Sequence, residues 1–583
     1  MIPVQMTPQT NPMPPPSPFD GRRTAAGWKQ FEQRQILELI RSLPEPKAYN
    51  RDEISANRRQ AAELKASISQ YQRSGQRPTQ HSQIIALSGA VCRLKVLLWR
   101  MFPINKLPVE IVVNIFRFAV WSTINSHEGN LLRFRLTWVC RRWRHIAIKD
   151  QTLWNTIWFK DIKLGYQRSK LYFDRAGTAT LDLRIEDDDE SRLIPGQPMS
   201  GDDMNRILDI LMAKSSQIRI LIVVVELWPP ILMLLNRLHQ YSQRLQQLER
   251  IEIHRTGRPY RWDGPGYPLS EYQHALSLCN GQTQRINYIC MNGIHLDWDR
   301  SCFTYLTHLD LRRMPPDLGP SLERFRYMLE SSPNLRKLSL DGAGPIMPMN
   351  SSARPYPPVF LPRLESLALG DFHVTYAIFC AGIIHAPNVR EITILNLVGE
   401  DHVQLLRVLT GKFPELLILA LFGVKIRRSA ENARIVMQWL LSIPKIRFMR
   451  IAAMETDLLD LFSIDGRFHI SDNIPLLPAA EVRQAIVANG SPIILCPALE
   501  VVEVQKININ SVVRFVSDRK KLEVPLRKLY IHHNSFRSMS PDETAILQKQ
   551  NYEPNFVNVT VPMCLTPMED YIWKQVRGED GKC

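Results

Sequence analysis

Residues 333–340 read Pro-Asn-Leu-Arg-Lys-Leu-Ser-Leu, and the same spacing recurs over more than half of the chain. In each copy an apolar residue is followed by two others, three and five positions later. Well-formed copies begin at positions 306, 335, 364, 389, 416 and 446, and weaker ones begin at 218, 248, 286, 499 and 526. Apolar residues at alternate positions predict a short strand with one face in a hydrophobic core. We therefore expect one strand from each copy.

A proline precedes six of these copies by two residues, at positions 333, 362, 387, 414, 444 and 497. Proline disfavours helix in the residue before it and lacks a backbone donor, so it predicts the end of a helix just ahead of the strand. Runs with helical spacing, such as Leu322–Leu329 and Leu405–Leu409, lie between copies. The well-formed copies are 29, 29, 25, 27 and 30 residues apart, which is the leucine-rich-repeat period or slightly longer. The pattern predicts an α/β fold with a leucine-rich-repeat strand-helix solenoid over residues 161–535.

The strand-lined face of such a solenoid is a common partner-binding surface. Because side chains alternate along a strand, residues two, four and six positions past each first apolar residue are expected on that face. In the later copies several of these residues are themselves apolar, namely Leu395, Ile418, Phe422 and Phe448. We expect these four to form an apolar patch that recognises a target protein. The alternative left open is that the C-terminal tail or a long loop covers them.

Residues 104–160 have the composition of a compact helical module. Leu107-Pro108 predicts a helix start, because proline pre-sets the backbone of a first helical turn. An apolar stripe follows at helical spacing and consists of Ile111, Ile115, Phe116 and Ala119. After a polar insertion that extends to about Leu136, a second stripe is expected from Val139, Cys140, Trp143, Ile146 and Ala147.

This segment resembles the F-box family, whose pattern is Leu-Pro-x-Glu-Ile, Ile-Phe, Val-Cys-Arg-x-Trp-Arg and then Leu-Trp. The corresponding residues here are 107–111, 115–116, 139–144 and 153–154. The stretch between Ala119 and Leu136 is longer than in the compact F-box. In this respect the chain is similar to F-box-like proteins of mushroom-forming fungi, which often carry a helical region before the F-box and leucine-rich repeats after it.

The resemblance implies a helical module that docks on the Skp adaptor of a cullin-based SCF ubiquitin ligase, while the solenoid holds an unknown target protein. It also implies which residues contact the adaptor, namely Leu107, Pro108, Ile111, Ile115, Phe116, Val139, Cys140 and Trp143. Trp154 is expected either to contact the adaptor or to pack against the repeats. So short a module has more apolar side chains than its interior can hide, and an exposed apolar patch marks a partner surface. The alternative is that these residues only form a small helical core.

The net charge of +16 is concentrated in residues 1–150, which hold 23 Lys and Arg against 10 Asp and Glu. Only +3 remains for residues 151–583, so this larger part lacks the basic footprint of a nucleic-acid-binding surface. Nucleic acid is therefore not an expected partner of the solenoid. Two alternative functions stay open: a nucleic-acid-associated factor that uses the basic N-terminal region, and a scaffold of the same fold that engages no ligase.

The remaining segments carry weaker signals. Residues 1–26 are proline-rich and predict a disordered tail, residues 27–103 predict a helical region, and residues 536–583 predict a C-terminal cap or tail. Nine cysteines without a Cys-x-x-Cys pair predict buried thiols in a reducing compartment, the cytoplasm or nucleus. The most apolar stretch, Ile218–Leu235, contains Arg219 and Glu226, so no membrane span is expected. No motif for catalysis, a cofactor or a metal occurs, and we expect no enzyme active site.

Overall fold

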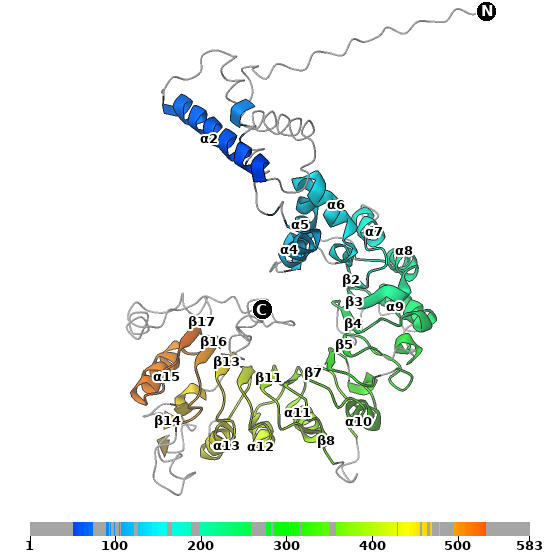
Figure 1. The fold of residues 1–583 in the computed structure, drawn as a ribbon. Helices are drawn as coiled ribbons and strands as arrows, with labels where there is room; N and C mark the ends of the chain where they lie inside the picture. The colour runs from blue at the N-terminus through cyan, green and yellow to red at the C-terminus, as the bar shows by residue number, and fades with distance from the viewer. Residues whose placement is uncertain are drawn as a thin grey trace, which may run out of the picture. The chain divides into compact units, whose positions relative to one another are not determined.

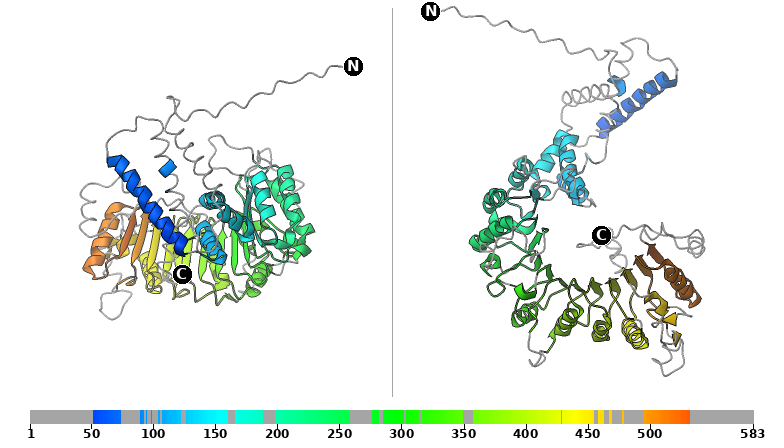
Figure 2. Two further views of the ribbon diagram at one scale, coloured as in Figure 1. Left: turned by 45° about the horizontal axis from the view of Figure 1, so that its top comes forward. Right: turned by 180° about the vertical axis from the view of Figure 1, so that it is seen from behind.

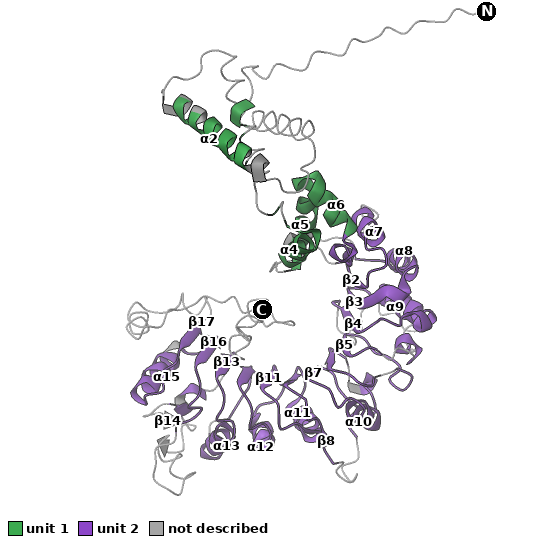
Figure 3. Ribbon diagram, viewed as in Figure 1, with its two compact units in different colours: residues 1–149 green, residues 150–583 purple. Residues whose placement is uncertain are grey.

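The computed structural model describes residues 51–73, 107–121, 126–159, 166–187, 198–257, 276–281, 285–301, 303–314, 316–348, 357–427, 429–454, 458–462, 467–468, 477–478 and 494–531, with a few single residues between 89 and 104. The chain divides into two compact units, residues 1–149 and 150–583, which are coloured separately in Figure 3. The tails expected at residues 1–26 and 536–583 lie outside the described residues. Among those described, no helix is both long and apolar enough to cross a membrane.

The first unit is helical where it is described. Its helices are α2 (Arg51–Arg73), α4 (Val109–Trp121), α5 (Ser126–Val139) and α6 (Arg141–Lys149). Helix α4 begins directly after Pro108, as predicted, and its first turn closes with a 3.1 Å hydrogen bond from the Val112 amide to the Pro108 carbonyl. Helices α4, α5 and α6 pack against one another. The stretch expected to be a polar insertion is therefore mostly the second helix of a three-helix module.

The second apolar stripe expected at residues 139–147 is divided between two helices. Helix α5 ends at Val139 and α6 begins at Arg141, with Cys140 between them. The Cys140 thiol accepts a hydrogen bond from the Trp143 amide at 3.4 Å, and its carbonyl accepts one from the Arg144 amide at 2.9 Å. The bond to the thiol satisfies an amide donor that the first turn of a helix leaves unpaired, and the bond to the carbonyl is the first regular i to i−4 bond of α6. The prediction of one continuous stripe is wrong, because Cys140 begins a new helix.

Among the described residues, the second unit has a parallel sheet of thirteen strands, in which each strand pairs with the next strand of the sheet along the chain (Figure 1). The strands are β1 (Thr156–Phe159), β2 (Leu181–Glu186), β3 (Ile218–Val225), β4 (Arg250–Arg255), β5 (Tyr288–Asn292), β6 (His308–Arg312), β7 (Lys337–Asp341), β9 (Ser366–Gly370), β11 (Glu391–Leu395), β12 (Ile418–Phe422), β13 (Phe448–Ala452), β16 (Val501–Gln505) and β17 (Lys528–Ile531). All eleven predicted copies contribute a strand to this sheet. Strands β1 and β2 were not predicted.

The apolar positions of the copies stay in register across the sheet. Leu309 pairs with Leu338, Leu338 with Leu367, and Leu367 with Ile392, and the same row continues to Leu529. This row is buried, as is the row two positions further along each strand. A parallel sheet covered by helices on this face accounts for the burial.

Helices connect the strands and lie on the outer side of the curved sheet, whose strands line the inner side (Figures 1 and 2). They are α7 (Gln167–Arg175), α8 (Gly201–Met212), α9 (Trp228–Gln240), α10 (Leu322–Glu330), α11 (Val374–Ile383), α12 (Val403–Leu409), α13 (Ala430–Leu441) and α15 (Ile509–Lys521). Short 3-10 turns lie at Gln151–Leu153, Ser215–Gln217, Ser242–Arg244, Leu278–Gly281, Pro316–Leu318 and Leu458–Phe462. Two small separate sheets pair β8 (Val359–Phe360) with β10 (Ile384–His385) and β14 (Arg467–Phe468) with β15 (Leu477–Pro478).

The registered prolines occupy the same place in their turns. In five copies, the residue two positions after the proline donates its amide to the carbonyl of the residue before the proline. Around Pro333, for example, the Leu335 amide donates to the Ser332 carbonyl at 3.0 Å. The fixed φ of proline suits the second residue of such a turn. Proline therefore shapes the turn that leads into each strand, in addition to ending the preceding helix.

A left-handed residue follows the strand in eight consecutive copies. These residues are Gly293, Arg313, Gly342, Asp371, Asn396, Gly423, Ala453 and Lys506. The amides of the first seven continue the interstrand ladder, as the Gly423 amide does to the Ala452 carbonyl at 2.9 Å. Only three of the eight are glycine, so this regular turn carried no recognisable sequence signal.

Candidate protein-docking site

Helix α4 has two apolar sides. Val112, Phe116 and Val120 are buried at spacings of four residues, whereas Ile111, Ile115 and Phe118 are exposed on the other side. Phe118 retains 73% of its surface, although Phe116, two residues earlier, retains none. A helix with one buried stripe covers a single core face. The second stripe is therefore not part of the core of the described helices.

The end of helix α5 adds two exposed apolar side chains. Trp138 retains 71% of its surface, and Val139 is exposed beside it in the sequence. The Trp138 ring is held against Phe134, with ring centroids 6.4 Å apart. We call Ile111, Ile115, Phe118, Trp138 and Val139 the exposed apolar set. Tryptophan is a preferred anchor in protein interfaces.

The structure divides the predicted adaptor contacts into three groups. Pro108, Ile111, Ile115 and Val139 are exposed, and Leu107, Cys140 and Trp143 are half-buried. Phe116 and Trp154 are fully buried, so Phe116 does not have the exposed surface expected of an adaptor contact, and Trp154 fits the second of its two predicted roles. Phe116 faces the core because it packs against Trp143, with ring centroids 4.8 Å apart.

Trp154 belongs to the second unit and packs within it. Its ring meets Tyr172 of α7 at 5.0 Å between centroids, and the Arg175 guanidinium lies 4.5 Å from its centroid. Of the two roles predicted for this tryptophan, packing against the following segment fits its burial. Phe118 and Trp138 were missed, although Phe118 continues the spacing of Ile111 and Ile115 at i+7 and i+3.

Basic side chains tie the three helices together. The Arg142 guanidinium of α6 donates to the Leu107 carbonyl before α4 at 2.7 Å. Arg144 donates to the Thr137 carbonyl of α5 at 2.8 Å, and the Arg133 guanidinium lies 4.9 Å from the centroid of the Trp121 ring. Thr137 lies in the last turn of α5, whose carbonyls have no acceptor role within the helix itself. These contacts hold the helices that present the exposed apolar set.

Cys140 is not an activated thiol. Burial raises the pKa of the Cys140 thiol above its usual value, even though hydrogen bonds from the Trp143 and Arg142 amides and the positive charge of Arg142 act in the opposite direction. A thiol of this kind stays protonated near neutral pH and is a weak nucleophile. Its basic neighbours therefore do not make it a reactive group.

The predicted target-binding residues lie on the strand-lined face, but three of the four are not accessible. Ile418 and Phe448 retain 1% of their surface and Phe422 retains 4%, while Leu395 is half-buried. Ile418 and Phe448 pack with Val501 and Tyr530, and Phe422 packs with Ala420, Ala452 and Leu395. These side chains occupy neighbouring strands in register and contact one another across the strand-lined face. The prediction of an exposed patch is corrected on this point.

The earlier part of the strand-lined face is polar instead. Arg250 of β4 lies over the Tyr288 ring at 4.0 Å, and Tyr288 in turn stacks on His308 at 4.8 Å between centroids. Arg312 donates twice to Asp310, at 2.7 and 2.6 Å. Burial and the nearby Lys337 lower the pKa of His308 to about 4, so this imidazole is neutral near pH 7. This part of the face carries polar and aromatic groups that are fixed by one another.

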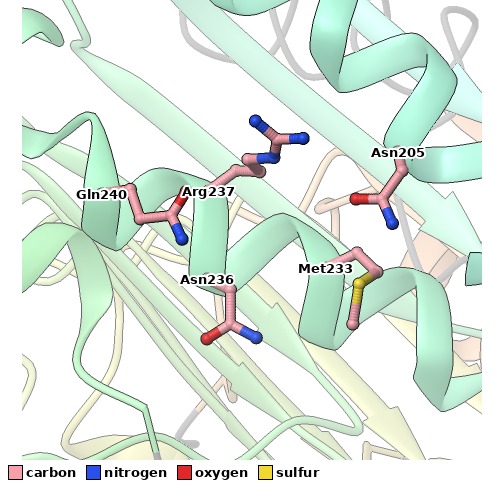
Figure 4. A pocket seen from close by; sticks show the side chains of 5 residues that line it. All are labelled: Asn205, Met233, Asn236, Arg237 and Gln240. Atoms are coloured by element: carbon pink, nitrogen blue, oxygen red, sulfur yellow. The ribbon is translucent and has the colours of Figure 1, made fainter.

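A shallow depression lies between helices α8 and α9 of the second unit (Figure 4). It is lined by Asn205, Met233, Asn236, Arg237 and Gln240. Arg237 already pairs with Asp209 at 2.6 Å, and the other lining groups are amides and a thioether. These groups provide neither a nucleophile nor an acid-base pair, so the depression does not have the chemistry of an active site.

Comparison with known proteins gives one result for the helical module. No curated protein matches the chain. Residues 104–160 match the F-box-like family, which covers α4, α5, α6, Trp154 and strand β1. This part of the chain is an F-box-like domain, and it is followed by a long parallel sheet.

Proposed function

We propose that the chain is the substrate-recognition subunit of an SCF-type ubiquitin ligase. In this role the F-box-like domain binds a Skp-type adaptor, and a leucine-rich-repeat solenoid binds the target protein. The chain itself supplies no catalytic residue; it accelerates ubiquitin transfer by holding target lysines near the charged enzyme. The observation that carries the proposal is the exposed apolar set on a domain that matches the F-box-like family.

Two features support separate binding sites for the adaptor and for the target. The apolar side of α4 that the module does not bury has the composition of an obligate interface. The parallel sheet of the second unit has the strand spacing and the turn prolines of leucine-rich repeats, and its strand-lined face carries rows of polar and aromatic side chains. We place the target on the polar part of that face, between β4 and β7.

Co-expression with a Skp-type adaptor tests the proposal. We expect wild-type chain to co-purify with the adaptor, and the pair Ile111→Asp and Ile115→Asp to lose it. The matched control is Phe360→Asp, which changes an even more exposed apolar side chain on strand β8 of the second unit. Failure of the wild-type chain to bind the adaptor would favour the scaffold alternative. Equal loss in both variants would point to misfolding, and circular dichroism spectra of each variant decide this.

A further inference from the structure

Four metal-binding residue types meet on the strand-lined face at β4 and β5. Glu252 and His254 are two residues apart on β4, so their side chains share a face. In the parallel pairing, Cys290 lies opposite Glu252 and Asn292 lies opposite His254. Adjacent strands are about 4.8 Å apart. The four side chains therefore occupy the corners of a small square.

Three of these residues already bring their ligand atoms together. The carboxylate oxygen of Glu252, the imidazole nitrogen of His254 and the sulfur of Cys290 lie within 4.8 Å of one another. His254 Nε2 is 3.1 Å from Glu252 Oε2. In a tetrahedral zinc site with bonds of about 2.0–2.3 Å, the ligand atoms are roughly 3–4 Å apart. An ion could enter this cluster after only small side-chain adjustments.

Glu252 has the outer contact that a metal-binding carboxylate needs. Arg250 donates its Nε to Oε1 of Glu252 at 2.6 Å, which leaves Oε2 directed at His254. Arg250 is itself fixed over the Tyr288 ring. Such outer hydrogen bonds orient the ligands of metal sites and tune their affinity.

Asn292 supplies an independent observation. Its side chain is buried, with 4% of its surface retained, and Oδ1 has no hydrogen-bond partner among the described residues. Burying an amide oxygen without a partner costs about 1–3 kcal/mol. A cation beside His254 would satisfy this atom, because carbonyl oxygens are metal ligands.

We propose that Glu252, His254, Cys290 and Asn292 bind one Zn²⁺ ion through Oε2, Nε2, Sγ and Oδ1. The mixture of nitrogen, sulfur and oxygen donors suits zinc, which takes all three. Binding needs Cys290 as the thiolate and His254 neutral with its proton on Nδ1, so one proton leaves Cys290 when the ion binds. The ion joins β4 to β5 on the polar part of the strand-lined face. The sequence alone predicted no metal site.

Titration of the full-length, chelator-treated chain with Co²⁺ and then Zn²⁺ tests the site. We expect one Co²⁺ per chain, with a thiolate-to-cobalt charge-transfer band that Zn²⁺ abolishes. Cys290→Ser should remove the band. His254→Ala should weaken Zn²⁺ binding more than about 100-fold, which is more than the loss of a residue that only hydrogen-bonds to a ligand causes. Cys140→Ser, which changes a thiol in the other unit, should leave both unchanged. Arg250→Gln should weaken binding by about 10- to 100-fold.

A variant that binds Zn²⁺ more tightly tests the site without depending on the loss variants, which could fail because they misfold. Asn292→Asp adds a charged oxygen at the proposed fourth ligand and should tighten Zn²⁺ binding relative to wild type. A wild-type chain that takes up no Co²⁺, or a Cys290→Ser chain that keeps the full band, would overturn the proposal. Either result would leave Arg250, Glu252 and His254 as a metal-free hydrogen-bond network. Because adaptor binding is not measured, this outcome is separate from that of the proposed function.

Discussion

Arg450 of β13 and Glu503 of β16 form an ion pair at 2.8 Å in which neither side chain keeps more than 5% of its surface. The two residues are 53 positions apart in the chain but directly opposite in the sheet. The pair lies between the apolar clusters around Phe448 and Phe422. A buried charge in such surroundings needs a partner, and Glu503 supplies one.

Removing one member of this pair should strongly destabilise the sheet. We expect Glu503→Gln to lower the free energy of unfolding by about 3–5 kcal/mol, since the Arg450 charge is left buried. The double variant Arg450→Met/Glu503→Leu should recover most of the loss. Urea unfolding followed by tryptophan fluorescence, to which the buried Trp439 of α13 contributes, measures both. A double variant as unstable as the single one would show that the charges themselves are required.

Neighbouring residues on α4 should respond oppositely to truncation. Phe116→Ala empties a buried site against Trp143 and should cost about 3–5 kcal/mol. Phe118→Ala removes an exposed ring and should change stability by less than about 0.5 kcal/mol while it weakens adaptor binding. Thermal unfolding and adaptor co-purification of the two variants give the comparison. Similar melting losses in both would contradict the two-sided helix.

The carboxyl group of Asp341 should make the folded chain less stable as the pH rises. Burial, with Asp371 beside it, raises the pKa of Asp341 to about 7. The unfolded chain gives up this proton near pH 4, whereas the folded chain keeps it to about pH 7. This group therefore has its full stabilising effect below about pH 4, and that effect is lost as the pH rises through 7.

The variant Asp341→Asn isolates this effect. It cannot ionise, so at pH 8 it should be more stable than wild type, by up to about 2–4 kcal/mol. Near pH 4 the two should be equal. Asp310→Asn is the control: Asp310 accepts two hydrogen bonds from Arg312, so its loss should destabilise the chain at pH 8. Urea unfolding at both pH values tests this, and no difference at pH 8 would contradict it.

The left-handed turn after each strand gives a backbone prediction. Gly423 has φ of 64°, and a β-carbon added there would meet no atom closer than 3.6 Å. Gly423→Ala should therefore cost only the conformational strain, about 1 kcal/mol. Gly382→Ala, in helix α11 with open space around it, should stabilise instead. Equal effects of the two in urea unfolding would rule out strain as the cause.

Much of the solenoid was predictable because its signals are local. A strand needs only alternating apolar residues, and a turn needs only a proline at its second position, so all eleven copies were found. The start of α4 at Pro108 followed from the same kind of local rule. Strand β2 was missed because its copy has Thr180 where the other copies begin with an apolar residue. Strand β1 was overlooked although Trp154, Ile157 and Phe159 keep the full spacing, because Trp154 was assigned to the helical module.

The site residues were less predictable because exposure is not a local property. Ile111, Ile115 and Phe116 look alike in the sequence, yet only Phe116 meets Trp143 and becomes core. The alternation of side chains placed Ile418 and Phe448 correctly on the strand-lined face, and we therefore expected them to be exposed. Alternation does not show which side chains pack against them on that face.

Residue order was enough to decide that a helical module is followed by many in-register strands, because each of those signals spans only a few neighbouring residues. The folded chain alone decided which apolar side chains stay uncovered, that Glu503 would meet Arg450, and that Glu252, His254 and Cys290 would share one corner of the sheet. These outcomes depend on contacts between strands and between helices, and a linear pattern does not encode which residues those contacts bring together.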